Sequence, residues 1–264
     1  ALYRAKHEGK GQYHYFEQEM DELARKRRET EIDLKLAIEH GQFELYYQPL
    51  FNTEEQKING FEALIRWNHP TRGLVSPLDF IPLAEETGLI VQIGEWVIKE
   101  ACHQAANWPE HIRVAINISP VQFRTKGLQS VLIQALTQSG LSPQRLELEI
   151  TESLLIDNVA ETLQALHSLR EMGVRVALDD FGTGYSSLSY LRSFPFDKIK
   201  IDRSFVDDIM SDKGSAAIIQ AITGLAAALG METIAEGVEL EEQVEMLLKN
   251  GCNNIQGFLL SRPV

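Results

Sequence analysis

Five acidic residues and one lysine stand at strand-like positions far apart in the sequence, and together they could support metal-dependent chemistry. Each lies within or directly after a short run rich in β-branched and other apolar residues. They are Glu62, Glu149, Asp179, Asp180, Glu236 and Lys200. Carboxylates that gather in one place raise one another's pKa, and burial penalises their charge further. We therefore expect divalent cations to bind among them.

The donor types favour a hard cation. Carboxylate and amide oxygens, without a set of His and Cys residues, favour Mg²⁺ or Mn²⁺ over Zn²⁺, although carboxylates also bind Ca²⁺. The adjacent pair Asp179-Asp180 could place one carboxylate between two ions, an arrangement used for in-line displacement at phosphorus. The seven histidines show no ligand spacing, so we predict no metal role for them.

The elements that must position these residues alternate between helical and strand periodicity from about Glu31 onward. Helices are expected at Glu29–His40, Leu89–Asn107, Val121–Ser139, Ala160–Met172, Ser215–Leu229 and Leu240–Lys249. Strands are expected at Phe43–Gln48, Gly60–Trp67, Val114–Ser119, Leu146–Thr151, Val174–Asp179, Lys198–Asp202, Glu232–Glu236 and Asn254–Gln256. Eight strands alternating with helices predict an α/β fold, a TIM-like (β/α)8 barrel with one antiparallel strand.

Strand alternation places the polar residues on one face. Successive side chains point to opposite faces of a strand, and one face of a barrel strand meets the barrel axis. The residues that oppose the apolar face of their strands include Asn117, Glu149, Asp179 and Lys200. Barrel interiors are normally apolar, so polar residues near the carboxyl ends of the strands indicate a site at that rim. Glu147 shares this parity but lies deeper, and we expect it to form an internal ion pair with Arg175.

Composition excludes several classes of protein. The 264 residues carry 25 Lys and Arg against 38 Asp and Glu, a formal net charge of −13. An acidic surface repels phosphate backbones, so no nucleic-acid polymer is expected as a partner. No run approaches the roughly 18 apolar residues of a membrane helix, so this segment is expected to make no membrane contact. Two cysteines in a chain of this size predict a reducing compartment and a cytoplasmic domain, whereas the parent protein could carry a membrane anchor.

The motifs that contain these residues resemble those of the EAL-domain phosphodiesterases, which hydrolyse the bacterial second messenger cyclic di-GMP. The tripeptide that names this family stands here as Glu62-Ala63-Leu64. The resemblance continues through Asn117-Ile118-Ser119, Glu149-Ile150-Thr151-Glu152, the run 179–188 that opens with Asp179-Asp180-Phe181-Gly182, Lys200-Ile201-Asp202, Ala235-Glu236-Gly237-Val238-Glu239 and Gln256-Gly257-Phe258. It covers the chain from about Glu31 to its end.

The first residues resemble a different family. Ala1-Leu2-Tyr3-Arg4-Ala5-Lys6 followed by Gly9-Lys10-Gly11 is similar to the end of a GGDEF diguanylate-cyclase domain. We therefore expect residues 1–28 to be the tail of an upstream GGDEF-like domain plus a linker helix, and residues 29–264 to be the EAL barrel domain. The first residue is Ala1, and we expect the chain to be a piece of a longer protein with upstream GGDEF or sensor domains.

The resemblance also implies a role for each site residue. Metal ligands would be Glu62, Asn117, Glu149 and Asp179, with Asp180 sharing a second ion and Glu236 supporting the metals and their waters. Catalysis would depend on Lys200, which positions and helps activate the attacking water, together with Glu236, Glu62 and Gln256. Substrate contacts would come from Gln48, Arg66 and Asp202, and the loop from Asp180 to Ser187 would be stabilised by Glu239 and Glu152.

The implied activity is that of a metal-dependent phosphodiesterase, a hydrolase that converts cyclic di-GMP to linear pGpG. It implies one or two Mg²⁺ or Mn²⁺ ions, inhibition by Ca²⁺, and a homodimer in bacterial signalling. The alternative is a catalytically silent cyclic di-GMP receptor, and a third possibility is an unrelated barrel enzyme with Lys200 as the base. Taken singly, Lys200 could be a structural ion-pair partner, Asn117 a helix cap and Gln256 a core amide.

Overall fold

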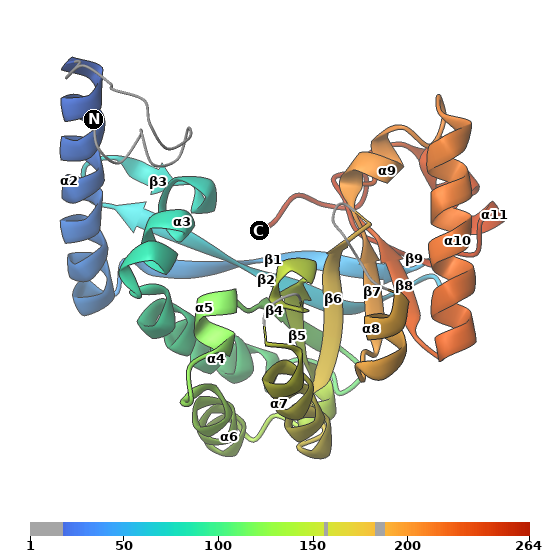
Figure 1. Cartoon of the computed structure of the whole chain (residues 1–264), viewed down its shortest axis with the longest axis horizontal. Coiled ribbons are helices and arrows are strands. Elements are labelled where there is room, and N and C mark those ends of the chain that lie inside the picture. Colours follow the sequence, from blue (N-terminus) through green and yellow to red (C-terminus); the bar gives the residue numbers. More distant parts are fainter. Residues whose placement is uncertain (1–17, 156–157, 183–187) are drawn as a thin grey trace. The chain divides into compact units, whose positions relative to one another are not determined.

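Eight strands of the chain hydrogen-bond side by side into a closed barrel (Figure 1). The computed structural model describes residues 18–155, 158–182 and 188–264. The barrel strands are β1 (Phe43–Asn52), β2 (Lys57–His69), β4 (Arg113–Asn117), β5 (Leu146–Thr151), β6 (Arg175–Phe181), β7 (Lys198–Ile201), β8 (Glu232–Ala235) and β9 (Asn254–Ile255). Strand β1 runs antiparallel to β9, and the pairs from β2 through β9 are parallel. The predicted TIM-like barrel with one antiparallel strand is confirmed.

Helices follow most of the strands. They are α2 (Gln18–His40), α3 (Pro77–Thr87), α4 (Ile90–Ala105), α5 (Pro120–Phe123), α6 (Leu128–Ser139), α7 (Val159–Glu171), α8 (Leu188–Ser193), α9 (Arg203–Asp207), α10 (Lys213–Leu229) and α11 (Glu241–Lys249), with short 3₁₀ turns at Pro143–Arg145 and Glu152–Leu155. In the part of the chain that the structure describes, no helix has the length and apolar content to cross a membrane.

The helices differ from the sequence prediction in several places, and the short helices α8 and α9 were not predicted. The predicted helix Val121–Ser139 is divided into α5 and α6, because α5 ends after one turn and α6 begins only after Gly127. Helix α3 was not predicted, although Pro77 occupies its first turn, where proline is favoured. Pro82 lies inside α3, and a proline at an interior position argues against a helix. Tertiary packing overrides this local preference.

The barrel strands carry apolar side chains on one face and the polar set on the other. In β5, Leu146, Leu148 and Ile150 are fully buried and alternate with the buried Glu147 and Glu149. An apolar cluster of Leu50, Ala115 and Ile234 fills part of the interior. Ile234 pairs in register with Lys200, so the two side chains share one face of the sheet. The interior is therefore apolar in some places and strongly charged in others.

The chain divides into two compact units. The larger comprises residues 44–65 and 91–264 and holds most of the barrel. The smaller comprises residues 1–43 and 66–90, and its described part includes α2, α3 and the short strand β3 (Gly73–Val75). Its core is aromatic, with ring centroids 5.5 Å apart for Trp67 and Phe80 and 5.9 Å apart for Phe43 and Phe80. The assignment of residues 1–28 to an upstream domain stays a prediction, and residues 1–17 lie outside the described part.

Candidate active site

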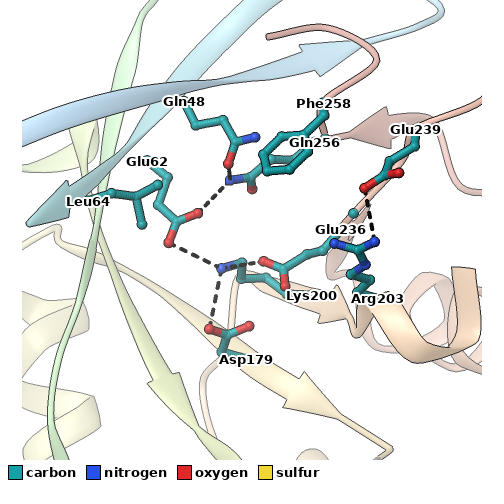
Figure 2. Close-up of a pocket in the computed structure, with 12 residues that line it drawn as sticks. Gln48, Glu62, Leu64, Asp179, Lys200, Arg203, Glu236, Glu239, Gln256 and Phe258 are labelled. Carbon is teal, nitrogen blue, oxygen red and sulfur yellow. Dashed lines mark hydrogen bonds and ion pairs between the residues drawn. The ribbon is translucent and has the colours of Figure 1, made fainter. Parts of the chain in front are cut away.

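The predicted carboxylates converge on one ammonium group inside the larger unit. Lys200 is 1% exposed, and its Nζ lies 2.5 Å from Glu149 Oε2 and 2.6 Å from Glu236 Oε1. The same Nζ lies 3.3 Å from Asp179 Oδ2 and 3.8 Å from Glu62 Oε1 (Figure 2). These residues come from β2, β5, β6 and β7, and from the position directly after β8. Strand alternation thus brings together the residues that the sequence analysis grouped.

Amide side chains surround the carboxylate of Glu62. Asn117 Nδ2 donates to Glu62 Oε1 at 2.6 Å, and Gln256 Nε2 donates to Glu62 Oε2 at 2.5 Å. Gln256 also donates to Gln48 Oε1 at 3.0 Å, and Gln48 Nε2 in turn donates to the carbonyl oxygen of Ser261 at 3.1 Å. A continuous hydrogen-bond chain therefore connects Glu62 to the loop after β9, and its members hold one another in place.

The electrostatics of the cluster show an excess of negative charge. Burial, together with the nearby carboxylate of Glu62, raises the pKa of Glu149 well above its ordinary value. Burial also raises the pKa of Glu236 to about 7, although Lys200 opposes this change. Burial alone would lower the pKa of Lys200, but the carboxylates, led by Glu149, raise it well above the ordinary value. One ammonium does not balance these four carboxylates, and a further cation would relieve the difference.

Glu62 is the exception within the cluster. Burial alone would raise the pKa of Glu62, but Lys200 and the hydrogen bonds from Gln256 and Asn117 lower it below its ordinary value. Hydrogen bonds to the charged form of a carboxyl favour that form. Glu62 therefore stays ionised in a buried place, as a metal-binding carboxylate must.

The donor set is chemically suited to a divalent cation. Among the described residues, no three His, Cys, Asp or Glu side chains converge in the geometry of a metal site, and the carboxylates converge on Lys200 Nζ instead. The available donors are carboxylate and amide oxygens, which Mg²⁺ and Mn²⁺ prefer. Their unbalanced charge also fits a divalent ion. The residues present therefore fit the implied metal, and the individual ligand assignments stay predictions.

Asp180 has an unusual backbone conformation next to the cluster. Its φ is +54°, a left-handed conformation that non-glycine residues seldom adopt. The register of β6 against β7 shifts between Leu178 and Phe181, which is the mark of a bulge. Asp180 N donates to Asp179 Oδ1 at 2.9 Å, and burial together with Asp179 raises the pKa of Asp180. Backbone strain of this kind is often found at functional sites, and here it lies directly beside a carboxylate that contacts Lys200.

Three predicted residues of the larger unit, Asp202, Glu152 and Glu239, are not among the residues that contact Lys200. Asp202 caps α9 by accepting a hydrogen bond from Ser204 N at 3.0 Å. Glu152 is buried, and neither of its carboxylate oxygens has a hydrogen-bond partner in the described part of the chain. The loop that Glu152 and Glu239 are predicted to stabilise includes residues 183–187, which lie outside the described residues. Arg66 belongs to the smaller unit, and its predicted substrate contact stays a prediction.

A second layer of charge lies below the cluster. Glu147 Oε2 accepts from Arg175 Nε at 3.2 Å, which confirms the predicted ion pair. Lys198, which was not among the predicted residues, also donates to Glu147 within this layer. Lys198 stands two residues before Lys200, so the same strand alternation that places Lys200 inside the barrel could have indicated it.

The cluster opens into a cavity of about 260 Å³. Its lining includes Gln48, Glu62, Leu64, Asp179, Lys200, Arg203, Glu236, Glu239, Gln256 and Phe258, all labelled in Figure 2. Arg203 was missed at the sequence level, because it follows β7 at the start of α9, where strand alternation no longer applies. Phe258, also at the rim, is 42% exposed. The cavity therefore combines an acidic floor with a polar and aromatic rim.

Comparison with known proteins identifies the family. The protein-family model described as "EAL domain" matches residues 31–263. The chain belongs to the EAL-domain family. It is 45% identical to the bifunctional diguanylate cyclase/cyclic di-GMP phosphodiesterase MucR of Pseudomonas aeruginosa, over all of this chain and 39% of that protein. It is 42% identical to the cyclic di-GMP phosphodiesterase PdeR of Escherichia coli, over all of this chain and 40% of PdeR.

Solved EAL structures share the fold. The MucR phosphodiesterase in complex with c-di-GMP superposes with a TM-score of 0.86 at 45% identity, covering 89% of this chain and 97% of that one. The FimX EAL domain of Pseudomonas aeruginosa bound to c-di-GMP superposes with a TM-score of 0.82 at 25% identity, covering 89% and 96%. The chain spans about a third to two fifths of the length of the curated relatives it matches.

Proposed function

We propose that this EAL domain hydrolyses cyclic di-GMP to linear pGpG with one or two Mg²⁺ or Mn²⁺ ions. The observation that carries the proposal is the convergence of Glu62, Glu149, Asp179 and Glu236 on the buried Lys200, with Asn117 bonded to Glu62. This cluster lies at the carboxyl ends of barrel strands, where TIM-barrel enzymes place their chemistry. Relatives named as cyclic di-GMP phosphodiesterases support the choice of substrate.

The chain's own residues supply binding, orientation and proton transfer. Glu62, Asn117, Glu149 and Asp179 would hold one ion, and Asp180 with Asp179 would hold a second. A bound ion would polarise a phosphoryl oxygen and lower the pKa of a water molecule. Lys200 Nζ is fixed by short contacts to Glu149 and Glu236, so it can orient the attacking water. Glu236, whose pKa is raised to about 7, is suited to accept a proton near neutral pH.

A receptor that binds cyclic di-GMP without cleaving it is the second candidate. The similarity to the FimX EAL domain bound to c-di-GMP supports binding, and binding alone does not imply hydrolysis. A receptor would not need a complete set of ligands. Here each predicted ligand type is present, and four of the five carboxylates contact Lys200. We therefore place the enzyme first.

The deciding experiment incubates the purified chain with cyclic di-GMP and MnCl₂ or MgCl₂ and separates the nucleotides by chromatography. The expected product is pGpG, and EDTA should abolish its formation. Glu62→Gln should do the same while the protein remains folded by circular dichroism. The control Glu245→Gln changes an exposed glutamate on α11 and should retain full turnover.

The outcomes separate the two candidates. Intact cyclic di-GMP that binds but is not cleaved would establish the receptor, and undiminished turnover by Glu62→Gln would disprove the assigned metal centre. Ca²⁺ should inhibit the Mn²⁺ reaction, because its larger and more flexible coordination shell orients water poorly. Equal turnover with Ca²⁺ would contradict that reasoning.

Further proposals concern the whole protein. We propose that the domain works as a homodimer coupled to the loop 180–187, and that the full-length protein carries upstream GGDEF or sensor domains. Relatives about two and a half to three times as long as this chain support the second point. We also propose a cytoplasmic location for this domain, within a parent protein that could be anchored in a membrane. Sedimentation of the purified domain tests the dimer, and full activity in a monomer would exclude the coupling.

A further inference from the structure

Arg203 and Glu239 form a half-exposed ion pair that lines the same cavity as Lys200. Arg203 Nη2 lies 2.9 Å from Glu239 Oε1, and the side chains are 50% and 41% exposed (Figure 2). Arg203 Nε also donates to Asp207 Oδ2 at 3.0 Å. These contacts occupy two N–H groups of the guanidinium, which has five. The pair therefore presents further donors and a carboxylate oxygen to a ligand in the cavity.

The backbone of Gly237 provides the seat for the arginine. Gly237 has a φ of +68°, and a Cβ at this position would lie 2.7 Å from Arg203 Cδ. The absence of a side chain lets the stem of Arg203 lie directly against the backbone. A side chain held by two carboxylates and a glycine surface loses little entropy when a ligand binds. Arg203 is thus oriented before the ligand arrives.

The charge around Arg203 indicates which part of a nucleotide it contacts. Asp207 and Glu239 contribute two negative charges to one positive charge, so the group is not an attractive site for a phosphate. A neutral ring edge with acceptors and donors in fixed order suits it better. Phe258 lines the same cavity and is 42% exposed. Arg262 lies over one face of its ring, 4.3 Å from the ring centroid, so a planar base would stack on the other face.

We propose that Arg203 and Glu239 read the base edge of the substrate and select guanine over adenine, an inference that rests on the proposed function. On the guanine edge, the acceptor O6 lies beside the donor N1–H. Arg203 donates to O6, and the second carboxylate oxygen of Glu239 accepts from N1–H. The adenine edge reverses the order, because its N6 amino group donates and its N1 accepts. Adenine would therefore set donor against donor and acceptor against acceptor.

The test is Arg203→Met, which keeps an unbranched stem over Gly237 and removes every donor. Isothermal titration measures the affinity of the folded protein for cyclic di-GMP and for cyclic di-AMP, and steady-state kinetics give KM and kcat for cyclic di-GMP. A good contact to a base edge favours the right base over the wrong one by roughly 10- to 100-fold. We therefore expect Arg203→Met to lose roughly 10- to 100-fold in affinity for cyclic di-GMP. The affinity for cyclic di-AMP should not fall, so the ratio of the affinities for cyclic di-GMP and cyclic di-AMP should decrease. The kcat for cyclic di-GMP should stay unchanged.

Two variants complete the design. Arg170→Met changes an exposed arginine in the last turn of α7 and should leave both affinities unaltered. Arg203→Lys keeps the charge and loses the planar fork, so it should lose most of the preference for guanine. It also provides a second measurement if Arg203→Met does not fold, which thermal unfolding monitored by circular dichroism would reveal.

Several results would overturn the proposal. An equal loss for both nucleotides would show that Arg203 contacts the phosphates, which the two ligands share. An unchanged preference for guanine in Arg203→Met, or a fall in kcat with KM unaltered, would also reject it. Failure of the wild-type protein to cleave cyclic di-GMP would contradict the proposed function. The relative affinities for the two nucleotides, measured by calorimetry, would still test whether Arg203 and Glu239 recognise guanine.

Discussion

Replacing Lys198 with methionine should reveal the energetic value of the charge layer below the active site. Glu147 is 1% exposed and Lys198 is 5% exposed, and the two form a buried ion pair. Arg175 contacts the other oxygen of Glu147 at 3.2 Å, and its Nη2 lies 2.9 Å from Glu232 Oε1. In Lys198→Met, Glu147 would keep only Arg175 as a partner and would remain inside the barrel.

The expected loss follows from the cost of leaving a buried charge without its partner. Removing one member of a buried pair typically costs about 3–5 kcal/mol, and the remaining contact to Arg175 places the estimate near the lower end, about 3 kcal/mol. Replacing both members with apolar residues of similar size is often neutral. Glu147→Leu combined with Lys198→Met should therefore recover most of the loss, because Arg175 keeps its contact with Glu232.

Equilibrium urea denaturation followed by circular dichroism measures these free energies of unfolding. Lys249→Met is a suitable control, because Lys249 lies on the surface, 3.9 Å from Glu245, and should cost at most about 1 kcal/mol. A loss in Lys198→Met no larger than that of the control, or a double variant as unstable as Lys198→Met, would show that the buried charge does not have this energetic value.

The pH dependence offers a second check on the same pair. Burial alone would raise the pKa of Glu147, but Lys198 and Arg175 lower it below its ordinary value of 4.5. A depressed folded-state pKa contributes stability that is present above 4.5 and is lost as the pH falls through the folded pKa. The deficit of Lys198→Met should therefore narrow in acid. A deficit of constant size at all pH values would show that packing, and not charge, explains it.

Three further predictions use other features of the structure. The pKa of Glu236 is raised from 4.5 to about 7, and each pKa unit corresponds to about 1.36 kcal/mol. As the pH rises through that interval, the metal-free protein should therefore lose about 3 kcal/mol of stability relative to Glu236→Gln. Gly257→Ala would place its Cβ 2.6 Å from the carbonyl carbon of Val238, and denaturation should show a loss of about 1–3 kcal/mol. Gly224→Ala meets nothing within 4 Å inside α10 and should add about 1 kcal/mol; a loss at Gly224 would contradict the helix argument.

Strand alternation explains why so much of the site could be predicted from the sequence. Glu149, Asp179 and Lys200 each oppose an apolar face within their strands, and the closed barrel gives those faces one axis. Alternation reports the direction of a side chain and not its depth. Lys198 and Lys200 share a direction, and only the register of β7 against its neighbours places one below the other.

Loops could not be predicted in the same way. Arg203 and Glu239 are brought together by the segment after β8, where Gly237 adopts a positive φ. The bulge at Asp180 likewise depends on how β6 fits against β7. A glycine or an aspartate in the sequence permits such a backbone conformation, but the tertiary structure selects it. The rim of the cavity therefore needed the structure, whereas its floor did not.

The two charge layers explain why a cation would bind at the rim and not deeper in the barrel. Glu147 and Glu149 are neighbours on the same face of β5, and both are almost fully buried. Burial alone would raise the pKa of both carboxyls. The net shift nevertheless lowers the pKa of Glu147 and raises that of Glu149. Two cations contact Glu147, whereas Glu149 shares Lys200 with other carboxylates. Opposite pKa shifts at nearly equal burial mean that negative charge is compensated in the lower layer and uncompensated in the upper one. A divalent ion would therefore be stabilised most by the carboxylates at the rim.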